Sequence, residues 1–495
     1  MTAAPSLGSL LAGIATLPPS LAALPAGDLH LDSRAVRQGD VFVALPGSRA
    51  HGADHAAAAR AAGAALVLLD PEGLVAPVEQ EGVVPVPGLR SLAGELARRR
   101  YGEAAAGLRL IGVTGTNGKT SCVQLLAAAL SSDAGLGPCG HVGTLGVGLG
   151  DWSEPGERTT PDVFSLHRTL ARLRQRGARS VAMEVSSHAL DQGRVQGLRF
   201  TVAAFTNLSR DHLDYHGSME AYGATKERLF HWPGLEAAVI HVGDAFGRGL
   251  AERLRPEVEC IRVGEAGSRA RLELGDLCCA RDGLGFTLRE GGEQVAVRAR
   301  LLGRFNALNL LVVAGCLRAL GLPLARTASL LNTLPPVRGR MQCIPGGPDQ
   351  PLVVVDYAHT PDALEQALLA VRAHVTGKVH CVFGCGGERD AGKRPLMGAV
   401  AERLADRVVV TDDNPRSEDG ADIVAAILAG MAEPARAQVV RDRGEAIATA
   451  LSAAAAGDAV LIAGKGHETW QESREGRRPF DDAAVAAAWL AGRAA

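Results

Sequence analysis

The 495-residue chain has few aromatic residues and no excess of charge of either sign. Phe, Trp and Tyr make up only 4% of it, so Ala, Leu, Val and Gly must fill most of its interior. Lys and Arg number 52 against 54 Asp and Glu, which gives a formal net charge of −2. Without a basic excess, sequence-independent binding of nucleic acid is excluded, and any anionic ligand must be held by a few well-placed groups.

Cysteine is also scarce, and long apolar runs are missing. The nine cysteines are odd in number and scattered, which suggests neither a disulfide framework nor a zinc ribbon, and favours reduced thiols in a cytoplasm. No stretch approaches the roughly 20 apolar residues of a membrane span. The apolar segment 7–24 lacks the basic start of a signal peptide and is broken by Pro18-Pro19, so we assign it to the first domain.

The balance of 47% hydrophobic and 21% charged residues is typical of a soluble globular protein with several cores. At roughly 150 residues per domain, the length predicts about three domains. Residues 28–100 indicate a small α/β module, with strands at 40–45, 65–69 and 83–86 and a helix at 55–62. From Leu108 a strand, a Gly-rich loop and a helix over 121–130 follow, and then strands at 180–185, 201–207 and 237–241.

After Pro335-Pro336 a third series of strands begins, at 352–356, 379–383, 407–411 and 459–463, with helices starting near Pro361, Lys393 and Ala421. Parallel, doubly wound sheets explain this alternation best. The polar segments 356–359, 384–390, 412–416 and 464–468 each follow a strand, so they should meet at one edge of the sheet. We therefore predict an α/β protein with a small N-terminal domain (1–104), a central P-loop-type parallel-sheet ATPase domain (105–336) and a C-terminal Rossmann-like domain (337–495).

The strongest local motif is Gly115-Thr116-Asn117-Gly118-Lys119-Thr120, between a predicted strand and a predicted helix. Backbone N–H groups of such a loop can hold phosphates, Lys119 can reach the β and γ oxygens, and the Thr120 hydroxyl can ligate Mg²⁺. A strict phosphate-binding loop has Gly five residues before Gly118, where Val113 stands, so an ordinary Gly-rich turn is the alternative.

Two more polar clusters follow strands. Glu184 lies at the end of the strand at 180–185 and can be a further Mg²⁺ ligand, although a carboxylate there, taken alone, is more often a helix cap or a salt-bridge partner. Residues 206–216 (Thr-Asn-Leu-Ser-Arg-Asp-His-Leu-Asp-Tyr-His) follow the next strand and contain His212. A lone histidine is usually an ordinary hydrogen-bonding residue, but polar clusters after three successive strands favour a functional site.

Six motifs occur in a fixed order along the chain: Gly115 to Thr120, Glu184-Val-Ser-Ser-His188, Thr206 to Gly217, Gly303-Arg-Phe-Asn306, Arg338-Gly-Arg-Met341 and Asp356-Tyr-Ala-His-Thr-Pro361. Together they closely resemble the Mur ligases, over about residues 31–468. The resemblance implies that a substrate carboxylate attacks ATP to give an acyl phosphate, from which an incoming amine displaces phosphate. It implies catalytic roles for Lys119, Glu184, His212 and Lys226.

The resemblance also implies two Mg²⁺ ions, with Thr120 and Glu184 on one and Glu184, His212 and Lys226 on the other. From the sequence alone, Lys226 beside Glu227 and Arg228 is typical of a solvated helix face. The resemblance implies instead that CO₂ adds to its neutral amine and makes it an anionic carbamate ligand, which requires surroundings that disfavour the ammonium.

The nucleotide and sugar-peptide contacts are carried over from the family position by position. The ATP-binding residues are Thr114, Gly115, Thr116, Asn117, Gly118, Lys119, Thr120, Asn306, Asn309, Arg340 and Asp356. The residues for a UDP-MurNAc-dipeptide are Leu31, Ser33, Ser48, Arg49 and Ala50 at the uridine end, and Thr159, Thr160, Ser186, Gln192 and Arg194 at the peptide end. This chain departs from the family pattern at Arg158, where a small amide is frequent, and at Pro161, where other members have Gly.

The amino acid would be selected by Asp413-Asn414-Pro415-Arg416, a signature that in the family marks users of meso-2,6-diaminopimelate. Arg416 offers a fork for the distal carboxylate that lysine lacks, and with lysine bound we expect this guanidinium to stay unpaired at a cost of several kcal/mol. The family's other diaminopimelate contacts match Arg389, Gly464 and Glu468. From the residues alone, without the resemblance, Asn-Pro-Arg is better explained as a turn at a strand end.

The predicted function is therefore ATP-dependent addition of diaminopimelate to the γ-carboxylate of D-Glu in UDP-MurNAc-L-Ala-D-Glu, a step of peptidoglycan synthesis in the cytoplasm. We expect a monomer that binds these small molecules and no nucleic acid, needs Mg²⁺, and uses CO₂ to modify Lys226. Alternatives are a lysine-adding or other Mur or folylpolyglutamate-type ligase and, from a different class, a regulatory P-loop ATPase. The second metal set with His212 and Lys226 has no role in such an ATPase, which counts against it.

Overall fold

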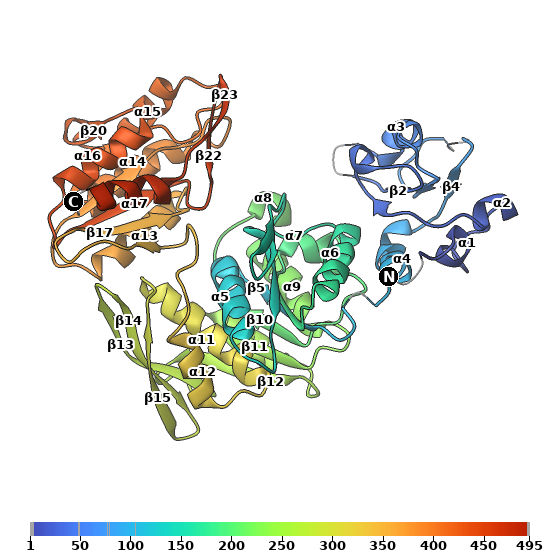
Figure 1. Ribbon diagram of the computed structural model, residues 1–495, viewed down its shortest axis with the longest axis horizontal. Helices are drawn as coiled ribbons and strands as arrows, with labels where there is room; N and C mark the ends of the chain where they lie inside the picture. The colour runs from blue at the N-terminus through green and yellow to red at the C-terminus, as the bar shows by residue number, and fades with distance from the viewer. Residues whose placement is uncertain (1–3, 48–49, 77, 79, 104, 493–495) are drawn as a thin grey trace. The chain divides into compact units, whose positions relative to one another are not determined.

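The computed structural model describes residues 4–47, 50–76, 78, 80–103 and 105–492 (Figure 1). The chain forms two compact units, Met1–Arg262 and Val263–Ala495. No helix in these described ranges has both the length and the apolarity that a membrane span needs. All nine cysteines lie in the described ranges and are free thiols, as the sequence predicted.

The first unit begins with a small α/β module. Its elements are α1 (Leu7–Leu10), α2 (Pro19–Ala22), β1 (Leu29–His30), β2 (Val41–Ala44), α3 (Ala56–Ala61), β3 (Leu66–Leu69), β4 (Val83–Pro85) and α4 (Leu89–Tyr101). The four strands form a parallel sheet in the order β1-β2-β3-β4. Val41 and Val43 enter one core and Phe42 and Ala44 the other, because strand side chains alternate between the two faces.

The N-terminal apolar segment belongs to this module, as predicted. Leu7, Leu10 and Leu11 are fully buried in the core that also contains residues of β2 and α4. The backbone N–H of Leu7 donates to Leu24 O at 2.8 Å, which closes the segment on itself. Residues 7–24 therefore help to build the first core.

A larger sheet makes up the rest of the first unit. Its strands are β5 (Arg109–Thr114), β6 (Cys139–Gly143), β7 (Gly146–Leu149), β8 (Trp152–Glu154), β9 (Ser180–Glu184), β10 (Val202–Phe205) and β11 (Ala237–His241). The helices are α5 (Lys119–Ser131), α6 (Val163–Gln175), α7 (Ser187–Asp191), α8 (Leu213–His216), α9 (Met219–Glu227) and α10 (Ala245–Glu252). The strand order is β11-β10-β5-β9-β6-β7-β8, parallel from β11 to β6.

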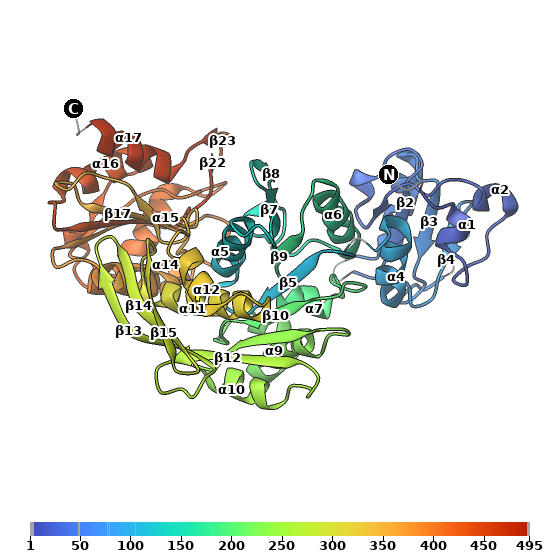
Figure 2. The same cartoon turned by 60° about the horizontal axis from the view of Figure 1, so that its bottom comes forward.

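This order places the three predicted polar clusters side by side. β5 lies between β9 and β10 (Figure 2), so the segments after Thr114, Glu184 and Phe205 leave the same edge of the sheet. The antiparallel strands β7 and β8 at the far edge were not predicted. Both strands are short, three and four residues, and Gly-rich β7 gives a weak sequence signal.

The second unit opens with strands, most of them antiparallel, that were not predicted from the sequence. The chain enters it along β12 (Glu259–Glu265), followed by β13 (Leu272–Ala280), β14 (Gly283–Glu290), β15 (Glu293–Ala299) and the helices α11 (Arg304–Ala319) and α12 (Leu324–Leu331). β13, β14 and β15 pair antiparallel. Gly291 and Gly292, with φ of 56° and 90°, form the two-residue turn between β14 and β15. Two-residue turns with positive φ are the usual connection in a β-hairpin.

The second unit ends in a Rossmann-like sheet with helices on both faces. Its elements are β16 (Gln342–Ile344), β17 (Leu352–Asp356), α13 (Pro361–Arg372), β18 (Val379–Phe383), α14 (Lys393–Leu404), β19 (Arg407–Val410), α15 (Gly420–Leu428), β20 (Gln438–Val439), α16 (Arg443–Ala453), β21 (Ala459–Ala463), the hairpin β22 (Trp470–Ser473) and β23 (Gly476–Pro479), and α17 (Asp482–Gly492). The order is β16-β17-β21-β18-β19-β20, with only β16 antiparallel.

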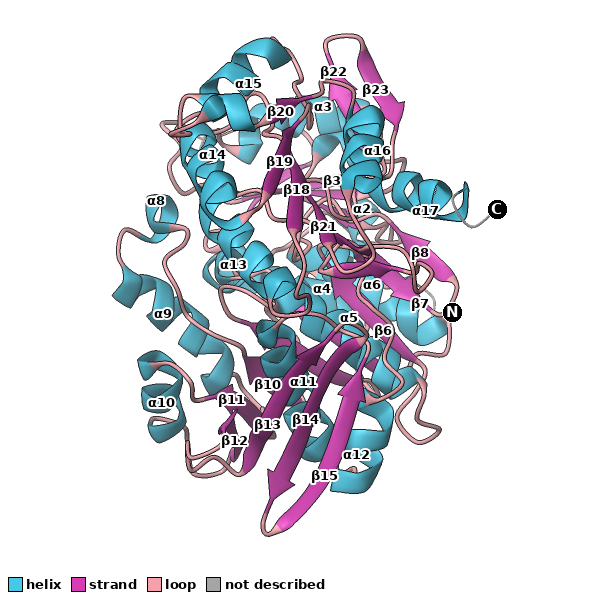
Figure 3. Ribbon diagram, turned by 90° about the vertical axis from the view of Figure 1, so that its left-hand side faces the viewer, coloured by secondary structure: helices cyan, strands magenta, loops and turns pink. Residues whose placement is uncertain are grey.

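Helices α13, α14 and α15 pack on one face of this sheet and α16 and α17 on the other (Figure 3). The predicted strands agree with β17, β18, β19 and β21 to within one residue. The four polar segments therefore leave the same edge, as expected. The prediction of parallel α/β sheets is confirmed for this sheet and for the centre of the first unit.

Candidate active site

The loop from Gly115 to Thr120 joins β5 to the start of α5. Gly115 has φ +145°, and a Cβ there would lie 1.9 Å from Thr206 Oγ1, so no side chain fits. The N–H groups of Thr116 and Asn117 donate to Asn207, at its O (2.9 Å) and Oδ1 (3.0 Å). The loop is thus fixed by the segment after β10, and the first-turn N–H groups of α5 have no acceptor within the helix. This is the geometry of an anion-binding helix start.

Two lysine side chains converge on this loop. Lys119 Nζ donates to Gly115 O at 2.9 Å and to Thr116 O at 2.8 Å. Lys226 Nζ, from α9, donates to the same Gly115 O at 2.9 Å. The loop therefore has two lysine amino groups beside it in addition to its N–H groups.

Lys226 is 1% exposed, so the sequence-based assignment to a solvated helix face is wrong. Burial, and then the charge of Lys119, lower the pKa of Lys226 from 10.5 to about 6, while Asp211 opposes the shift. Its Nζ lies 4.3 Å from the centre of the Tyr222 ring. The surroundings disfavour the ammonium form, which is the condition that a reactive neutral amine requires.

Glu184 lies at the end of β9 and is 1% exposed. Its two carboxylate oxygens lie 3.0 and 3.1 Å from the Thr120 hydroxyl, and the N–H of Thr144 donates to Oε1 at 2.7 Å. No cationic side chain of the described residues pairs with it, so neither a salt bridge nor a helix cap accounts for Glu184. A buried carboxylate beside a threonine hydroxyl supplies the hard oxygen donors that Mg²⁺ prefers.

A chain of hydrogen bonds runs from Glu184 to the predicted peptide-binding residues. The Thr160 hydroxyl donates to Glu184 O at 2.8 Å, and Arg194 Nη1 donates to Thr160 O at 2.8 Å. Arg194 also donates to Gln192 Oε1 at 2.6 and 3.1 Å. Burial and the charge of Arg158 lower the pKa of Arg194. Thr160, Gln192 and Arg194 thus form one group, and Ser186 joins it through an N–H donated to Thr160 Oγ1 at 3.2 Å.

His212 lies in an aromatic and histidine cluster on α7, α8 and α9. Its backbone is left-handed, with φ of 53°, and its ring centre is 4.8 Å from that of His188 and 6.1 Å from that of Tyr222. No hydrogen bond in the described part of the chain joins His212 or Lys226 to Glu184. Nor do three or more His, Cys, Asp or Glu side chains of that part gather as a metal cluster. A protein-only cage is absent there, whereas the pair Thr120 and Glu184 fits an Mg²⁺ ion that also takes phosphate oxygens.

The predicted uridine residues lie on two segments of the first module. Leu31 is an exposed apolar side chain, and Ser33 begins a short 3₁₀ turn whose N-cap is Asp32, the residue between the two. Ser48 and Arg49 lie outside the described residues, and Ala50 beside them is exposed. The side chains of Leu31 and Ala50 are thus accessible to a ligand.

The predicted nucleotide residues of the second unit form two small groups. Asn306 and Asn309, in α11, are buried, and Asn309 Nδ2 donates to Asn306 Oδ1 at 3.0 Å. Asp356 accepts N–H bonds from Met341 at 2.7 Å and Ala358 at 2.9 Å. Burial raises the pKa of Asp356, an effect that nearby Arg340 opposes.

The predicted amino-acid residues lie on adjacent loops of the same edge. Asn414 Nδ2 donates to Glu468 Oε2 at 2.8 Å, and Arg416 Nη1 donates to Gly387 O at 2.6 Å. Arg416 Nε lies 3.5 Å from Glu472 Oε2 of β22. The expectation that Arg416 stays unpaired without a distal carboxylate is therefore wrong, because the protein itself supplies Glu472.

The other predicted residues of this group are placed as follows. Asp413 is buried, and burial raises the pKa of its carboxyl. Gly464 follows β21 with φ +116°, and a Cβ there would lie 2.5 Å from Asp413 Oδ2. Pro415 is half-buried and Arg389 is exposed. Asp413, Asn414, Gly464 and Glu468 are thus brought together, and Arg389 lies on the loop whose Gly387 accepts from Arg416.

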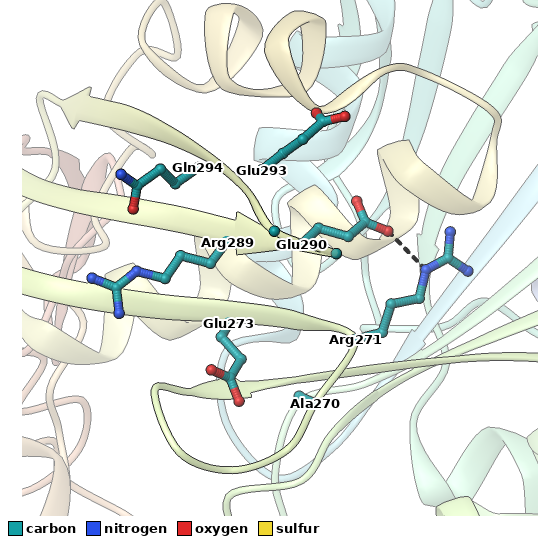
Figure 4. A pocket seen from close by; sticks show the side chains of 9 residues that line it. Ala270, Arg271, Glu273, Arg289, Glu290, Glu293 and Gln294 are labelled. Carbon is teal, nitrogen blue, oxygen red and sulfur yellow. Dashed lines mark hydrogen bonds and ion pairs between the residues drawn. The ribbon is translucent and has the colours of Figure 1, made fainter.

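A cavity of about 250 Å³ in the second unit is unrelated to these residues (Figure 4). It is lined by β13, β14 and the turns beside them, with alternating acidic and basic side chains. Arg271 pairs with Glu290 at 2.7 Å, and Arg289 pairs with Asp276 at 2.6 Å. Arg271 and Glu290, which both line the cavity, thus pair with each other, and none of the predicted site residues lines it.

Three residues of the first-unit site were not predicted from the sequence: Gly143, Thr144 and Tyr222. Thr144, after β6, holds both carboxylate oxygens of Glu184, and its hydroxyl lies 3.2 Å from that of Thr159. Gly143 before it is required, since a Cβ there would lie 2.3 Å from Glu184 Oε1. Tyr222 covers Lys226. A Gly-Thr pair after an apolar strand was a usable signal for Thr144, whereas nothing in the sequence marked Tyr222.

Family models match three successive parts of the chain. They are the Mur ligase family catalytic domain over residues 28–101, the Mur ligase middle domain over 113–317 and the Mur ligase glutamate ligase domain over 339–466. A relative from Xanthomonas campestris, a UDP-N-acetylmuramoyl-L-alanyl-D-glutamate–2,6-diaminopimelate ligase, is 55% identical over 461 residues, 93% of this chain and 92% of its own. A relative of the same name from Ectopseudomonas mendocina is 53% identical, covering 94% and 96%.

A solved structure of a ligase of that name is similar in fold, with a TM-score of 0.71 and 34% identity, covering 97% of this chain and 98% of the other. The family segments account for most of the chain and follow one another in the order of the predicted domains. This chain therefore belongs to the Mur ligase family and has its three-domain α/β architecture.

Proposed function

We propose that this protein is the ATP-dependent ligase that joins meso-2,6-diaminopimelate to the γ-carboxylate of D-Glu in UDP-MurNAc-L-Ala-D-Glu, releasing ADP and phosphate. The observation that carries the proposal is 55% identity over 93% of the chain to a relative of that name. The reaction builds the stem peptide of peptidoglycan, on which cell shape and division depend. We place the enzyme in the cytoplasm as a monomer.

The chemistry begins when the γ-carboxylate oxygen attacks the γ-phosphorus of ATP and ADP leaves. Two anions must meet in this step, so positive charge has to offset their repulsion. Lys119 is placed to do so, since its ammonium already folds over the loop at Gly115 O and Thr116 O. Thr114 to Thr120 would hold the phosphates, and Asn306, Asn309, Arg340 and Asp356 the adenosine.

One Mg²⁺ ion would be held by the Thr120 hydroxyl and the Glu184 carboxylate, which lie next to each other. A second ion would be held by Glu184, His212 and the carbamate of Lys226. When bound, these ions supply charge neutralisation at the phosphates. Thr144 orients Glu184 for this role through its 2.7 Å N–H bond. The low pKa of Lys226 keeps its amine neutral near pH 7. The amine nitrogen can then attack CO₂ and lose a proton to water, giving the anionic carbamate.

The acyl phosphate formed in the first step reacts next with the amine of diaminopimelate, and the bridging oxygen leaves with phosphate. We assign the amino-acid end to Arg389, Asp413, Asn414, Pro415, Arg416, Gly464 and Glu468. The sugar-peptide end is assigned to Leu31, Ser33, Ser48, Arg49, Ala50, Thr159, Thr160, Ser186, Gln192 and Arg194. We place the corresponding domains at 1–104, 105–336 and 337–495.

Selectivity for diaminopimelate would come from exchange of partners at Arg416. The distal carboxylate replaces the 3.5 Å contact with Glu472 by a bidentate pair, which is geometrically better. With lysine no such exchange occurs, and Glu472 keeps its place. Diaminopimelate would therefore be preferred over lysine because it gives Arg416 a better partner than Glu472. Lysine would not leave Arg416 as an unpaired buried charge.

To test this, the protein is incubated with ATP, Mg²⁺, bicarbonate and UDP-MurNAc-L-Ala-D-Glu, plus either diaminopimelate or lysine. The release of phosphate and the mass of the product are measured. We expect a product heavier by one diaminopimelate minus water. Phosphate release without a new amide would support a regulatory ATPase instead. Faster turnover with lysine would support a lysine-adding ligase.

A further inference from the structure

Lys465 is a fully buried lysine to which the proposed function gives no role. It lies in the turn after β21, between Gly464 and Glu468, and none of its surface is exposed. An ammonium that is taken out of water is tolerated only when it is paired and hydrogen-bonded. Its partners therefore indicate what the lysine is there to hold.

Those partners are two residues assigned to the amino-acid end. Lys465 Nζ donates to Asn414 Oδ1 at 3.0 Å and to Glu468 Oε2 at 3.1 Å. Asn414 Nδ2 donates to the same Glu468 Oε2 at 2.8 Å, which closes a triangle of three side chains. The N–H of Glu472 adds a bond to Asn414 Oδ1 at 2.9 Å. The amide of Asn414 has one orientation in this network, because its reverse would face the ammonium with an NH₂ group.

The two carboxylate oxygens of Glu468 differ in their hydrogen bonds within this triangle. Oε2 accepts from both Lys465 and Asn414, whereas no donor of the described residues bonds to Oε1. The Glu468 side chain is 19% exposed, so Oε1 is accessible. A carboxylate held this way presents one oriented oxygen to a donor such as an ammonium group.

The small number of lysines in the chain also supports a specific role for Lys465. It contains five lysines against 47 arginines, so Arg is its usual cation. Three of the five are Lys119 and Lys226 at the phosphate loop and Lys465 here, and the other two, Lys378 and Lys393, lie on the second unit. A compact ammonium fits a closed space between two acceptors, where the planar fork of Arg would not.

We infer that Lys465 is a positioning residue for the amino acid: it fixes Asn414 and Glu468 so that Glu468 Oε1 receives an ammonium group of the diamino acid substrate. The inference rests on the proposed function, since it names the substrate of that reaction. Lys465 itself does not touch the substrate and acts through the two side chains that it holds.

The test compares Lys465→Met with the wild-type enzyme by steady-state kinetics, varying each substrate in turn. Without the ammonium, Glu468 loses its fixed geometry, and we expect the KM for diaminopimelate to rise about 10- to 100-fold. The KM values for ATP and the UDP-sugar peptide should stay within about twofold, because their sites use other residues. A KM for diaminopimelate close to wild type, or an equal rise in all three, would overturn the inference.

A split of the kinetic constants and a second variant separate positioning from folding. In Lys465→Met the KM for diaminopimelate should rise while kcat at saturating diaminopimelate stays within about threefold, because Lys465 does not touch the reacting atoms. Lys465→Met/Glu468→Gln removes both charges, so its thermal midpoint should return toward wild type while the KM stays high. Recovery of the KM in this double variant would refute the positioning role.

Lys378→Met, which removes an exposed lysine from the same unit, is the matched control and should leave all three KM values unchanged. The proposed function and the role of Lys465 can be refuted independently of each other. If the wild type makes no amide from diaminopimelate, the proposed function is wrong. If it does and Lys465→Met has a normal KM, only the role of Lys465 is wrong.

Discussion

Replacing Lys226 with Met should make the protein more stable in buffer free of CO₂. The wild-type chain gives up a proton at this site on folding, because burial and Lys119 lower the pKa of Lys226 from 10.5 to about 6. At pH 7 an unfolded lysine is charged, and removing its proton costs about 1.4 kcal/mol for each pH unit below 10.5, or about 5 kcal/mol in total. Methionine of similar length has no such cost.

One favourable contact is lost in the same variant. The hydrogen bond from Lys226 Nζ to Gly115 O contributes about 1 kcal/mol, so a net gain of about 4 kcal/mol remains. For a compact unit of this size, about 2 to 4 °C accompanies each kcal/mol, and the first unit should therefore melt about 10 °C higher. CO₂ must be excluded, because its addition to the folded amine would stabilise the wild type.

The sign of the pH dependence follows from proton binding. Between about pH 6 and 10.5 the unfolded chain holds a proton at Lys226 that the folded chain does not. Wild-type stability therefore rises with pH through this window by about 1.4 kcal/mol per unit relative to Lys226→Met, and the advantage of the variant shrinks accordingly. Below the folded pKa the difference is constant.

The assay is scanning calorimetry of both proteins from pH 7 to 9 in degassed buffer, with Lys378→Met as the control for loss of an exposed lysine. The control should follow the wild type at every pH. A Lys226→Met protein less stable than wild type at pH 7, or a difference that does not change with pH, would refute the buried neutral amine.

Three further predictions concern activity. Lys226→Ala should lose turnover that short carboxylic acids partly restore, because they can supply the missing anionic oxygens; indifference of activity to the substitution would remove the carbamate. Thr144→Val should raise the Mg²⁺ concentration for half-maximal activity about tenfold, since Glu184 Oε2 loses its hydroxyl contact while the backbone N–H bond to Oε1 stays; an unchanged Mg²⁺ titration would contradict this role. Glu472→Gln should lower the KM for diaminopimelate about two- to fivefold by freeing Arg416, and a raised KM would show that Glu472 contacts the substrate instead.

Much of the fold could be predicted because parallel strands are buried on both faces and appear as short apolar runs. β17, β18 and β21 match their predicted ranges for this reason. β13 to β15 have mixed burial, with exposed charged residues between buried ones, and were overlooked although Gly291-Gly292 marks a hairpin. Their alternating pattern contains no continuous apolar run, which is the signal that marks the buried parallel strands.

The site was predictable where a motif follows a strand and unpredictable where a partner comes from a distant segment. Glu184 could be identified, but its partner Thr144 is 40 residues earlier. Lys226 looked solvated beside Glu227 and Arg228, because burial by Tyr222 and the phosphate loop is a tertiary effect. Arg416 was expected to lack a partner for the same reason, since Glu472 approaches it from a separate hairpin.

The central claim, that the carboxylate itself attacks ATP, is tested most directly by oxygen tracing. UDP-MurNAc-L-Ala-D-Glu carrying ¹⁸O in the γ-carboxylate is turned over with ATP and diaminopimelate in ordinary water, and the released phosphate is analysed by mass spectrometry. The acyl-phosphate route predicts one ¹⁸O in each phosphate, because the bridging oxygen leaves with it. Phosphate without ¹⁸O, with three oxygens from ATP and one from water, would contradict the route and make the protein an ATPase.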